Sequence, residues 1–403
     1  MGGDPPPAVD GVYRLRTSPG LIVNRLVAGD GVTDHNIVNL PAVHEHTTFA
    51  FELQHEAGAG ASGHIVGSRP KAPKLAGERA FIQSALLYTS ADGRRRIRVR
   101  TQPVQVVREL APLVRSAQPP TLAVLQAKLA ADDLSRTPAK SVAAALHDSC
   151  AATMLGVRDL VPPPLRRVDM QMLLARPLEL SPLLALGTLK LPPLALPLSA
   201  RRYDPDAAAL SLSRLLQAPA HVSCQMIAPM LHVIHLRDEG DGWAEPPSKP
   251  PAGPPQDAPA EPTPPAAGAN NGPGAAPKTR EMAAASGGDI SPAGIYLLDA
   301  GDGLLLWVGA QASPSFVAAL FGEAAKQGAL ADGAPLLAAS ANVQAARLHA
   351  LLSSLREGRP HAAPLRVLVQ GGTGQPDFFS RLPADGYEAF MLGLHTGKVA
   401  PKL

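Results

Sequence analysis

Four consecutive residues at positions 147–150 are of types that can carry out nucleophilic chemistry: His147, Asp148, Ser149 and Cys150. A nucleophile needs a base held within hydrogen-bond reach. Apolar residues recur every four positions from Val142 to Met154, which predicts a helix. Because neighbouring residues of a helix point in different directions, we do not expect these four side chains to form a catalytic triad.

Three histidines suggest a metal site at first sight. His44, His46 and His55 lie close in sequence, but no cysteine or paired carboxylate stands at ligand spacing. We therefore expect no metal there, and we expect His232 and His235 to be core or capping residues. The sequence contains no phosphate-binding loop, nucleophile elbow or H-E-x-x-H helix, and Gly371–Gly374 is not followed by the Lys-Ser/Thr pair that a phosphate loop requires.

The composition excludes several classes of protein. The chain has 403 residues and a formal net charge of +3, without the basic excess of a nucleic-acid binder. Its two cysteines give no disulfide framework, which suits the cytosol. The N-terminus lacks the pattern of a secretory signal, and prolines interrupt the leucine-rich stretch 173–198, so we expect a soluble protein without a membrane span.

The N-terminal hundred residues are strand-like. Two β-prone runs, Phe81–Thr89 and Arg94–Thr101, flank an Asp-Gly turn, which predicts a hairpin. Alternation predicts that Ile97, Val99 and Thr101 form a core face and that the arginines between them form a basic stripe. Arg95, Arg96 and Arg98 are our candidates for contact with an acidic partner or a membrane, and a solvated strand face is the alternative.

The C-terminal region has a denser pattern. Apolar runs at Ile295–Asp299 and Leu304–Gly309 flank a Gly/Asp turn, and Ser313-Pro314 predicts the start of a helix. A second helix around 343–355, a strand at 365–369 and a final helix with Phe390 follow. Trp307 is expected in the core. The arrangement resembles a gelsolin-like domain, a fold that binds other proteins.

Several motifs, in one order, resemble the large subunits of the COPII inner coat. The hairpin sequence from Gln83 to Val99, with A-L-L-Y-T, D-G and R-R-I-R-V, resembles the cargo-adaptor type of subunit. Other segments agree in order, and they are Arg16–Leu21, Leu183–Lys190, Pro229–His235 and Leu355–Pro360.

The resemblance implies a multidomain α+β protein. We expect a partial β-sandwich at 1–103, an all-α helical domain at 104–237, a disordered linker rich in Pro, Ala and Gly at 238–288, and a gelsolin-like α/β domain at 289–403. The family's zinc finger and trunk domain, which precede this region, are absent from the chain. We therefore expect no cofactor and no metal, and a sandwich with an open edge. The chain is expected to be a shortened relative or part of a longer protein.

The function implied by the resemblance is that of a non-enzymatic cargo adaptor in ER-to-Golgi transport. The implied partners are the sister subunit of the inner coat, the cytosolic tails of ER cargo proteins and, peripherally, the ER membrane; no nucleic acid is implied. The implied location is the cytoplasm and the COPII vesicle coat. The alternative is an actin-binding protein of the gelsolin type, suggested by the last domain alone, and an enzyme is a third possibility that the missing motifs disfavour.

Overall fold

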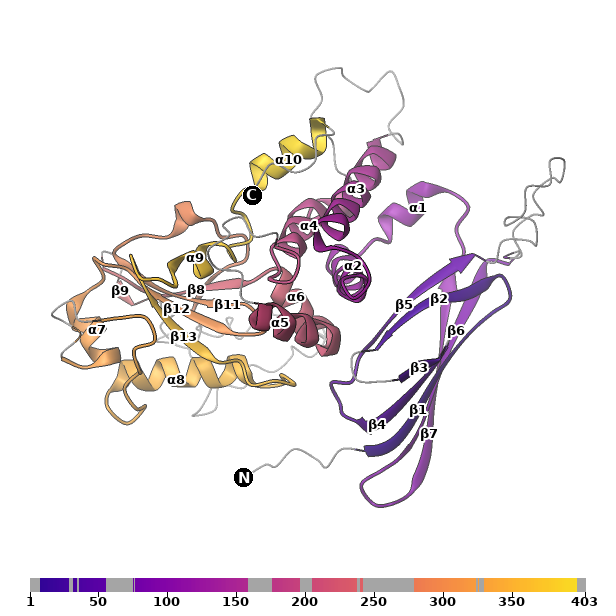
Figure 1. Cartoon of the computed structure of the whole chain (residues 1–403), viewed down its shortest axis with the longest axis horizontal. Coiled ribbons are helices and arrows are strands. Elements are labelled where there is room, and N and C mark those ends of the chain that lie inside the picture. The colour runs from indigo at the N-terminus through magenta and orange to yellow at the C-terminus, as the bar shows by residue number, and fades with distance from the viewer. Residues whose placement is uncertain are drawn as a thin grey trace, which may run out of the picture. The chain divides into compact units, whose positions relative to one another are not determined.

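The computed structural model describes residues 8–28, 32–34, 36–55, 75, 77–158, 176–195, 205–237, 240–241, 279–323, 325 and 330–396. These residues form two units, Met1–Ala228 with Gly386–Leu403 and Pro229–Asp385. The first unit holds strands and a helical layer, and the second holds a mixed sheet with helices (Figure 1). The expected linker 238–288 lies for the most part, at 238–239 and 242–278, outside the described residues.

The strands of the first unit form two sheets. The larger sheet has the order β3-β4-β1-β6-β7, and the smaller one pairs β2 with β5. The strand bounds are β1 Ala8–Thr17, β2 Leu21–Ala28, β3 Val32–Asp34, β4 Ile37–Val43, β5 Phe49–His55, β6 Arg79–Thr89 and β7 Arg95–Gln105. Tyr13 of β1 stacks on Phe49 of β5 with ring centroids 4.4 Å apart, so the two sheets pack through aromatic side chains.

The expected hairpin at 81–101 is confirmed. β6 and β7 pair antiparallel over eleven residues, from Arg79 with Gln105 to Thr89 with Arg95. Gly93 in the turn has φ +77°, a conformation that favours glycine, and its N–H donates to Ser90 O at 2.8 Å. β7 stands at the end of the sheet order and is exposed along its whole length. β7 is therefore an exposed edge strand of the larger sheet in the described part of the chain.

The helical layer comprises α1 Leu110–Arg115, α2 Pro119–Asp133, α3 Ala139–Arg158, η2 Arg176–Leu178, α4 Ser181–Leu189, α5 Pro205–Gln217 and α6 Ala220–Ile227. Its apolar faces meet in one cluster that includes Ala127, Leu184 and Leu215. A Cβ at Gly187 of α4 would lie 2.1 Å from Ile227 O, so the close approach of α4 and α6 requires glycine there. The buried Lys128 ammonium donates to three backbone oxygens at the end of α5, at 2.7–2.9 Å, and these acceptors compensate for burying the amine.

The second unit is built on a sheet of order β10-β8-β11-β12-β13, with β9 also paired to β8. The strands are β8 Met230–Leu236, β9 Gly240–Asp241, β10 Arg280–Met282, β11 Gly294–Asp299, β12 Leu304–Val308 and β13 Leu365–Val369, and the helices are η3 Gly287–Asp289, α7 Pro314–Phe321, α8 Val343–Arg356 and α9 Gln375–Phe379. β12 and β13 run parallel, so α7 and α8 lie in the crossover between them.

This sheet is buried on both faces. Leu297 and Leu306 pack with α7 and α8 on one side, and Trp307 packs with Phe378 of α9 on the other. The predicted hairpin, the helix after Ser313-Pro314 and the core position of Trp307 are thereby confirmed. Ser313 does not cap α7 with its side chain; its hydroxyl lies 2.9 Å from that of Ser315 instead.

Three segments differ from the expected boundaries. β8, expected in the helical region 104–237, is a strand that pairs with β11 of the second unit. Arg280–Met282, expected in the linker 238–288, is β10 and pairs with β8. The final helix, α10 Tyr387–Thr396, was expected in the domain 289–403, but Phe390 and Leu394 pack on Cys150 and Met154 of the first unit. In each case the deciding partner is remote in sequence.

Candidate interaction surface

The predicted arginines lie on an exposed hairpin whose turn is held by Asp92. The Ser90 hydroxyl donates to the Arg94 carbonyl at 3.0 Å and also contacts the Asp92 carboxylate. Hydrogen bonds from the Ser90 hydroxyl and the Arg94 N–H, with the Arg96 guanidinium, lower the pKa of Asp92 below its ordinary value. The turn is therefore fixed by local polar contacts.

The three candidate arginines differ in what they contact. The Arg95 guanidinium donates to Asp10 Oδ2 at 2.8 Å and to Thr89 Oγ1 at 3.0 Å, which ties β7 to the start of β1. Arg96 donates to Asp92 Oδ2 at 2.7 Å. Arg98 is exposed and has no ion pair within the described part of the chain. Arg98 is the candidate whose charge is most available to a partner.

The face assignment of β7 was wrong. Ile97 and Val99 were expected in the core, but they are 66% and 51% exposed. Cross-strand pairing puts Arg98 opposite Leu86, which in turn pairs with the inward Tyr13. The basic stripe is thus on the inner side of the sheet, at a margin that the two-stranded sheet β2–β5 leaves uncovered, and the apolar residues face outward.

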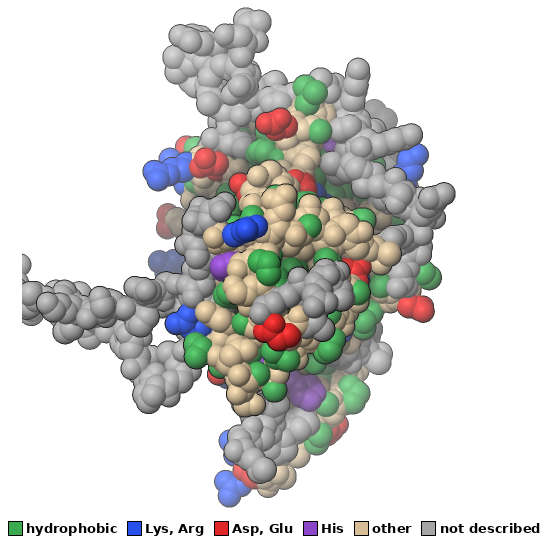
Figure 2. All heavy atoms as spheres, turned by 90° about the vertical axis from the view of Figure 1, so that its left-hand side faces the viewer, with side chains coloured by type: hydrophobic (Ala, Val, Ile, Leu, Met, Phe, Trp, Pro, Cys, Tyr) green, Lys and Arg blue, Asp and Glu red, His purple; other side chains and the backbone are tan. Residues whose placement is uncertain are grey.

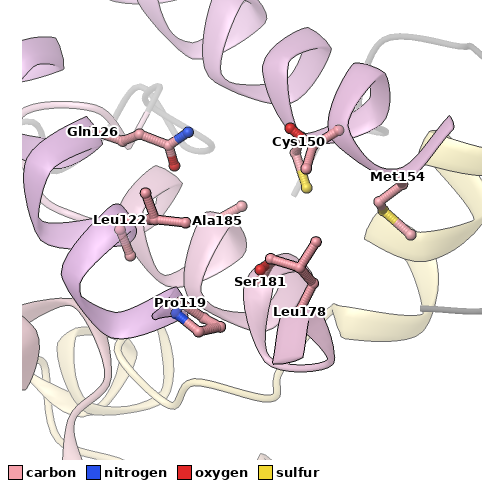
Figure 3. Close-up of a pocket in the computed structure, with 10 residues that line it drawn as sticks. Pro119, Leu122, Gln126, Cys150, Met154, Leu178, Ser181 and Ala185 are labelled. Carbon is pink, nitrogen blue, oxygen red and sulfur yellow. The ribbon is translucent and has the colours of Figure 1, made fainter. Parts of the chain in front are cut away.

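The four residues at 147–150, whose types can carry out nucleophilic chemistry, do not form a reactive group. Cys150 is buried, and burial raises the pKa of its thiol to about 11, so it is a thiol and not a thiolate at neutral pH. His147 is buried against Phe390, and its Nδ1 lies 3.4 Å from Asp148 Oδ1. Cys150 and Met154 also line a cavity of about 60 Å³ between α2, α3 and α4 (Figure 3). Substrate pockets are several times larger.

His232 and His235 lie in the core of the second unit, whereas His44 and His55 are exposed. His232 of β8 is buried, its Nδ1 lies 2.8 Å from Thr279 Oγ1, and burial lowers its pKa. His235 is buried and stacks on Phe316 at 4.2 Å. Within the described ranges, no three His, Cys, Asp or Glu side chains gather as a metal site.

The glycine-rich loop 371–374 is occupied by a carboxylate of the protein itself. Asp332 accepts the N–H groups of Val369 and Gly374, both at 2.8 Å. Burial acts to raise the pKa of Asp332, but these donors outweigh it and hold the pKa below its ordinary value. The segment is thus a loop, as expected, and the Asp332 carboxylate accepts hydrogen bonds from its backbone.

Two ion pairs that the sequence analysis missed organise the units. In the first unit, Arg25 of β2 donates to Asp132 and to Leu129 O of α2, which joins the smaller sheet to the helical layer. In the second, Arg359 donates two hydrogen bonds to Asp299, at 3.0 and 2.5 Å, where β11 ends. Arg359 lies in the motif Leu355–Pro360, but the motif gave no sign of its partner, which only the fold shows.

Surface charge is dispersed on the side that carries α7. In Figure 2, acidic and basic side chains are interspersed with hydrophobic ones among the residues described there, and no patch of one sign dominates. None of the described helices is long and apolar enough to cross a membrane. These features define a multidomain α+β protein whose candidate sites are contact surfaces.

Comparison with known proteins shows which proteins the chain resembles. Residues 8–107 match the model of the Sec23/Sec24 beta-sandwich domain. The chain is 24% identical over 385 residues to the protein transport protein Sec24A of Mus musculus, covering 94% of this chain and 30% of Sec24A. The crystal structure of the human COPII-coat protein Sec24c matches with a TM-score of 0.72 and 22% identity, over 97% of this chain and 46% of that one.

Residues 8–107 thus match a Sec23/Sec24 β-sandwich domain, and nearly the whole chain is similar in sequence to Sec24A and in fold to Sec24c. The chain thus spans less than half the length of the relatives it matches.

Proposed function

We propose that this chain acts as a COPII cargo-adaptor component in ER-to-Golgi transport. The observation that carries the proposal is similarity along nearly the whole chain: 94% of it aligns with Sec24A and 97% with the fold of Sec24c. The chain would work by contact, without an enzymatic step and without a cofactor of its own. The proposal includes the division of the chain into a β-sandwich, a helical domain, a linker and a gelsolin-like domain. In this division β8 and β10 belong to the gelsolin-like domain and α10 to the helical domain.

The proposed partners are the sister subunit of the inner coat, cytosolic tails of ER cargo and the ER membrane surface. Arg96 and Arg98, on the inner side of the sheet, support the membrane or acidic contact, since each basic residue near an anionic bilayer contributes roughly 1 kcal/mol. Arg95, the third candidate, lies on the outward side with Ile97. Arg95 and Arg96 are already paired with Asp10 and Asp92, so Arg98 would contribute the most.

The test is recruitment of the full chain to ER microsomes with the other inner-coat components. We expect recruitment that depends on the sister subunit, and enrichment of cargo tails on the recruited chain. Failure to bind the sister subunit would contradict the proposal. Cosedimentation with filamentous actin, which the gelsolin-type alternative requires, is expected to be negative.

The basic stripe is tested by flotation with phosphatidylserine vesicles. The double change Arg96→Glu, Arg98→Glu is expected to weaken flotation, because it reverses two charges on the stripe. Arg14→Glu, Arg16→Glu is the matched control: it reverses the same number of exposed charges on β1, on the opposite face of the sheet. Equal flotation of the stripe variant and the unmodified chain would exclude the stripe as a membrane contact.

A further inference from the structure

The outward face of the larger sandwich sheet carries an apolar strip. Cross-strand pairing arranges its side chains in rows that run across β1, β6 and β7. One row holds Val12, Leu87 and Ile97, and the next holds Arg14, Ala85 and Val99. Phe81 of β6 lies on the same face and is 46% exposed. An apolar face of this kind, open on a folded protein, marks an interaction site.

Two arginines run beside the strip. Arg14 and Arg16 of β1 are exposed on this face, and within the described part of the chain neither guanidinium has an ion-pair partner. β6 separates β1 from β7, so the basic column and the apolar column of Ile97 and Val99 lie about 10 Å apart. The face is therefore apolar at Ile97 and Val99 along β7, where Arg95 at the end of the strand is paired with Asp10, and cationic along β1.

We propose that this face binds an amphipathic helix of a partner protein, seated along β6 with apolar side chains on β7 and acidic side chains toward Arg14 and Arg16. The spacing fits: alternate residues of a strand are about 7 Å apart, and positions i and i+4 of a helix are about 6 Å apart. A helix is also about 10 Å wide, which matches the distance between the two columns.

The helical form follows from the hydrogen-bonding needs of the partner. Side chains and not backbone groups of the sheet point out of this face, so it gives an extended peptide few partners for its N–H and C=O groups. A helix satisfies these groups internally. Because Arg14 and Arg16 are positively charged, the flank of the partner helix that faces them is expected to be acidic.

Two other occupants fit less well. A second copy of the chain, packed through the same face, would add a second set of Arg14 and Arg16 to the interface and leave four positive charges without acidic partners. An anionic bilayer would suit the arginines, but membrane-contacting surfaces favour Trp and Tyr, and the only aromatic ring that the described strands place here is Phe81. Both occupants are outcomes of the test.

The test uses the full chain and two synthetic 18-residue helical peptides. Both have a leucine and alanine face; one carries glutamate along one flank, and the other carries lysine at the same positions. We expect fluorescence anisotropy to show binding of the glutamate peptide, weakened by salt, and at least tenfold weaker binding of the lysine peptide. Ile97→Glu, Val99→Glu is expected to weaken binding of the glutamate peptide at least tenfold.

Charge exchange sharpens the test. Arg14→Glu, Arg16→Glu is expected to reverse the preference, so that the lysine peptide binds better. Arg96→Glu, Arg98→Glu, which changes the opposite face of the same sheet, is the matched control and is expected to bind like the unmodified chain. All six substituted side chains are exposed, and thermal melting followed by circular dichroism checks that each variant is folded.

Four outcomes would overturn the proposal. They are equal binding of the two peptides, loss of binding in the Arg96→Glu, Arg98→Glu control, a dimer in analytical ultracentrifugation that Ile97→Glu dissociates, and flotation with phosphatidylserine vesicles that requires Ile97 and Val99. The proposed coat function is tested through the sister subunit and the opposite face, so either proposal can fail while the other stands.

Discussion

The hairpins β6–β7 and β11–β12 have the same design and opposite surroundings. Both are antiparallel and close through a turn that contains Asp and Gly. Every residue of β11 and β12 is buried, whereas every residue of β7 is exposed. A hairpin sequence thus defines a pairing of strands, and the layers packed around it decide whether the pair forms a core or a surface.

The largest expected contrast is between truncating a large apolar side chain in each of the two hairpins. Trp307→Ala in β12 is expected to lower the free energy of unfolding by about 3–5 kcal/mol, because it removes a large side chain that is 1% exposed. Ile97→Ala in β7 is expected to change it by no more than about 0.5 kcal/mol. Urea denaturation measures both; similar losses would contradict the comparison.

Removing the charge of the carboxylate beside each turn should also affect stability far more at the buried turn than at the exposed one. Asp299→Asn leaves the Arg359 guanidinium buried without its anionic partner, and breaking such a pair costs about 3–5 kcal/mol. Asp92→Asn, at the exposed turn, is expected to leave the thermal midpoint nearly unchanged. A midpoint shift for Asp92→Asn as large as that for Asp299→Asn would show that the exposed turn is as important as the buried one.

The buried sheet should also respond to mild acid. Burial lowers the pKa of His232 below its usual 6.5, so the folded second unit binds this proton less readily than the unfolded chain does. The contribution of neutral, buried His232 to the free energy of unfolding is fully present above pH 6.5. It is lost as the pH falls from 6.5 through the lowered pKa that His232 has in the folded state. His232→Asn, which does not titrate, is the control: its stability should fall less with acid between pH 7 and 5. Parallel curves would contradict the assignment.

The sequence predicted local elements well and their surroundings less well. The runs around Leu297, Leu306 and Phe316 are so uniformly apolar that only a buried sheet and helix accommodate them, and the structure has both. Ile97 and Val99 alternate with arginines, so the apolar side chains and the arginines lie on opposite faces of the strand. The alternation does not say which of the two faces a second layer covers. The exposure of the apolar face could not be deduced from the alternation of apolar and basic residues alone.

Remote pairing set the other limits of prediction. Arg280–Met282 has no apolar period, and it is a strand because β8 offers hydrogen bonds to it. The Arg359–Asp299 pair joins residues sixty positions apart, and the motif around Arg359 gave only one of them. Of the candidate site, the three arginines and their exposure were predictable, whereas the pairing of Arg95 with Asp10 required the fold.

The pairing of β8 with β10 has a practical consequence. Val233 lies opposite Arg280, so the two ends of the long intervening segment meet as neighbours in one sheet. When the anchors of a segment are fixed side by side, closing it costs only about 0.6 kcal/mol more for each doubling of its length. A reporter or an epitope tag inserted between positions 242 and 278 is therefore expected to leave the pairing of β8 with β9 and β10 in place.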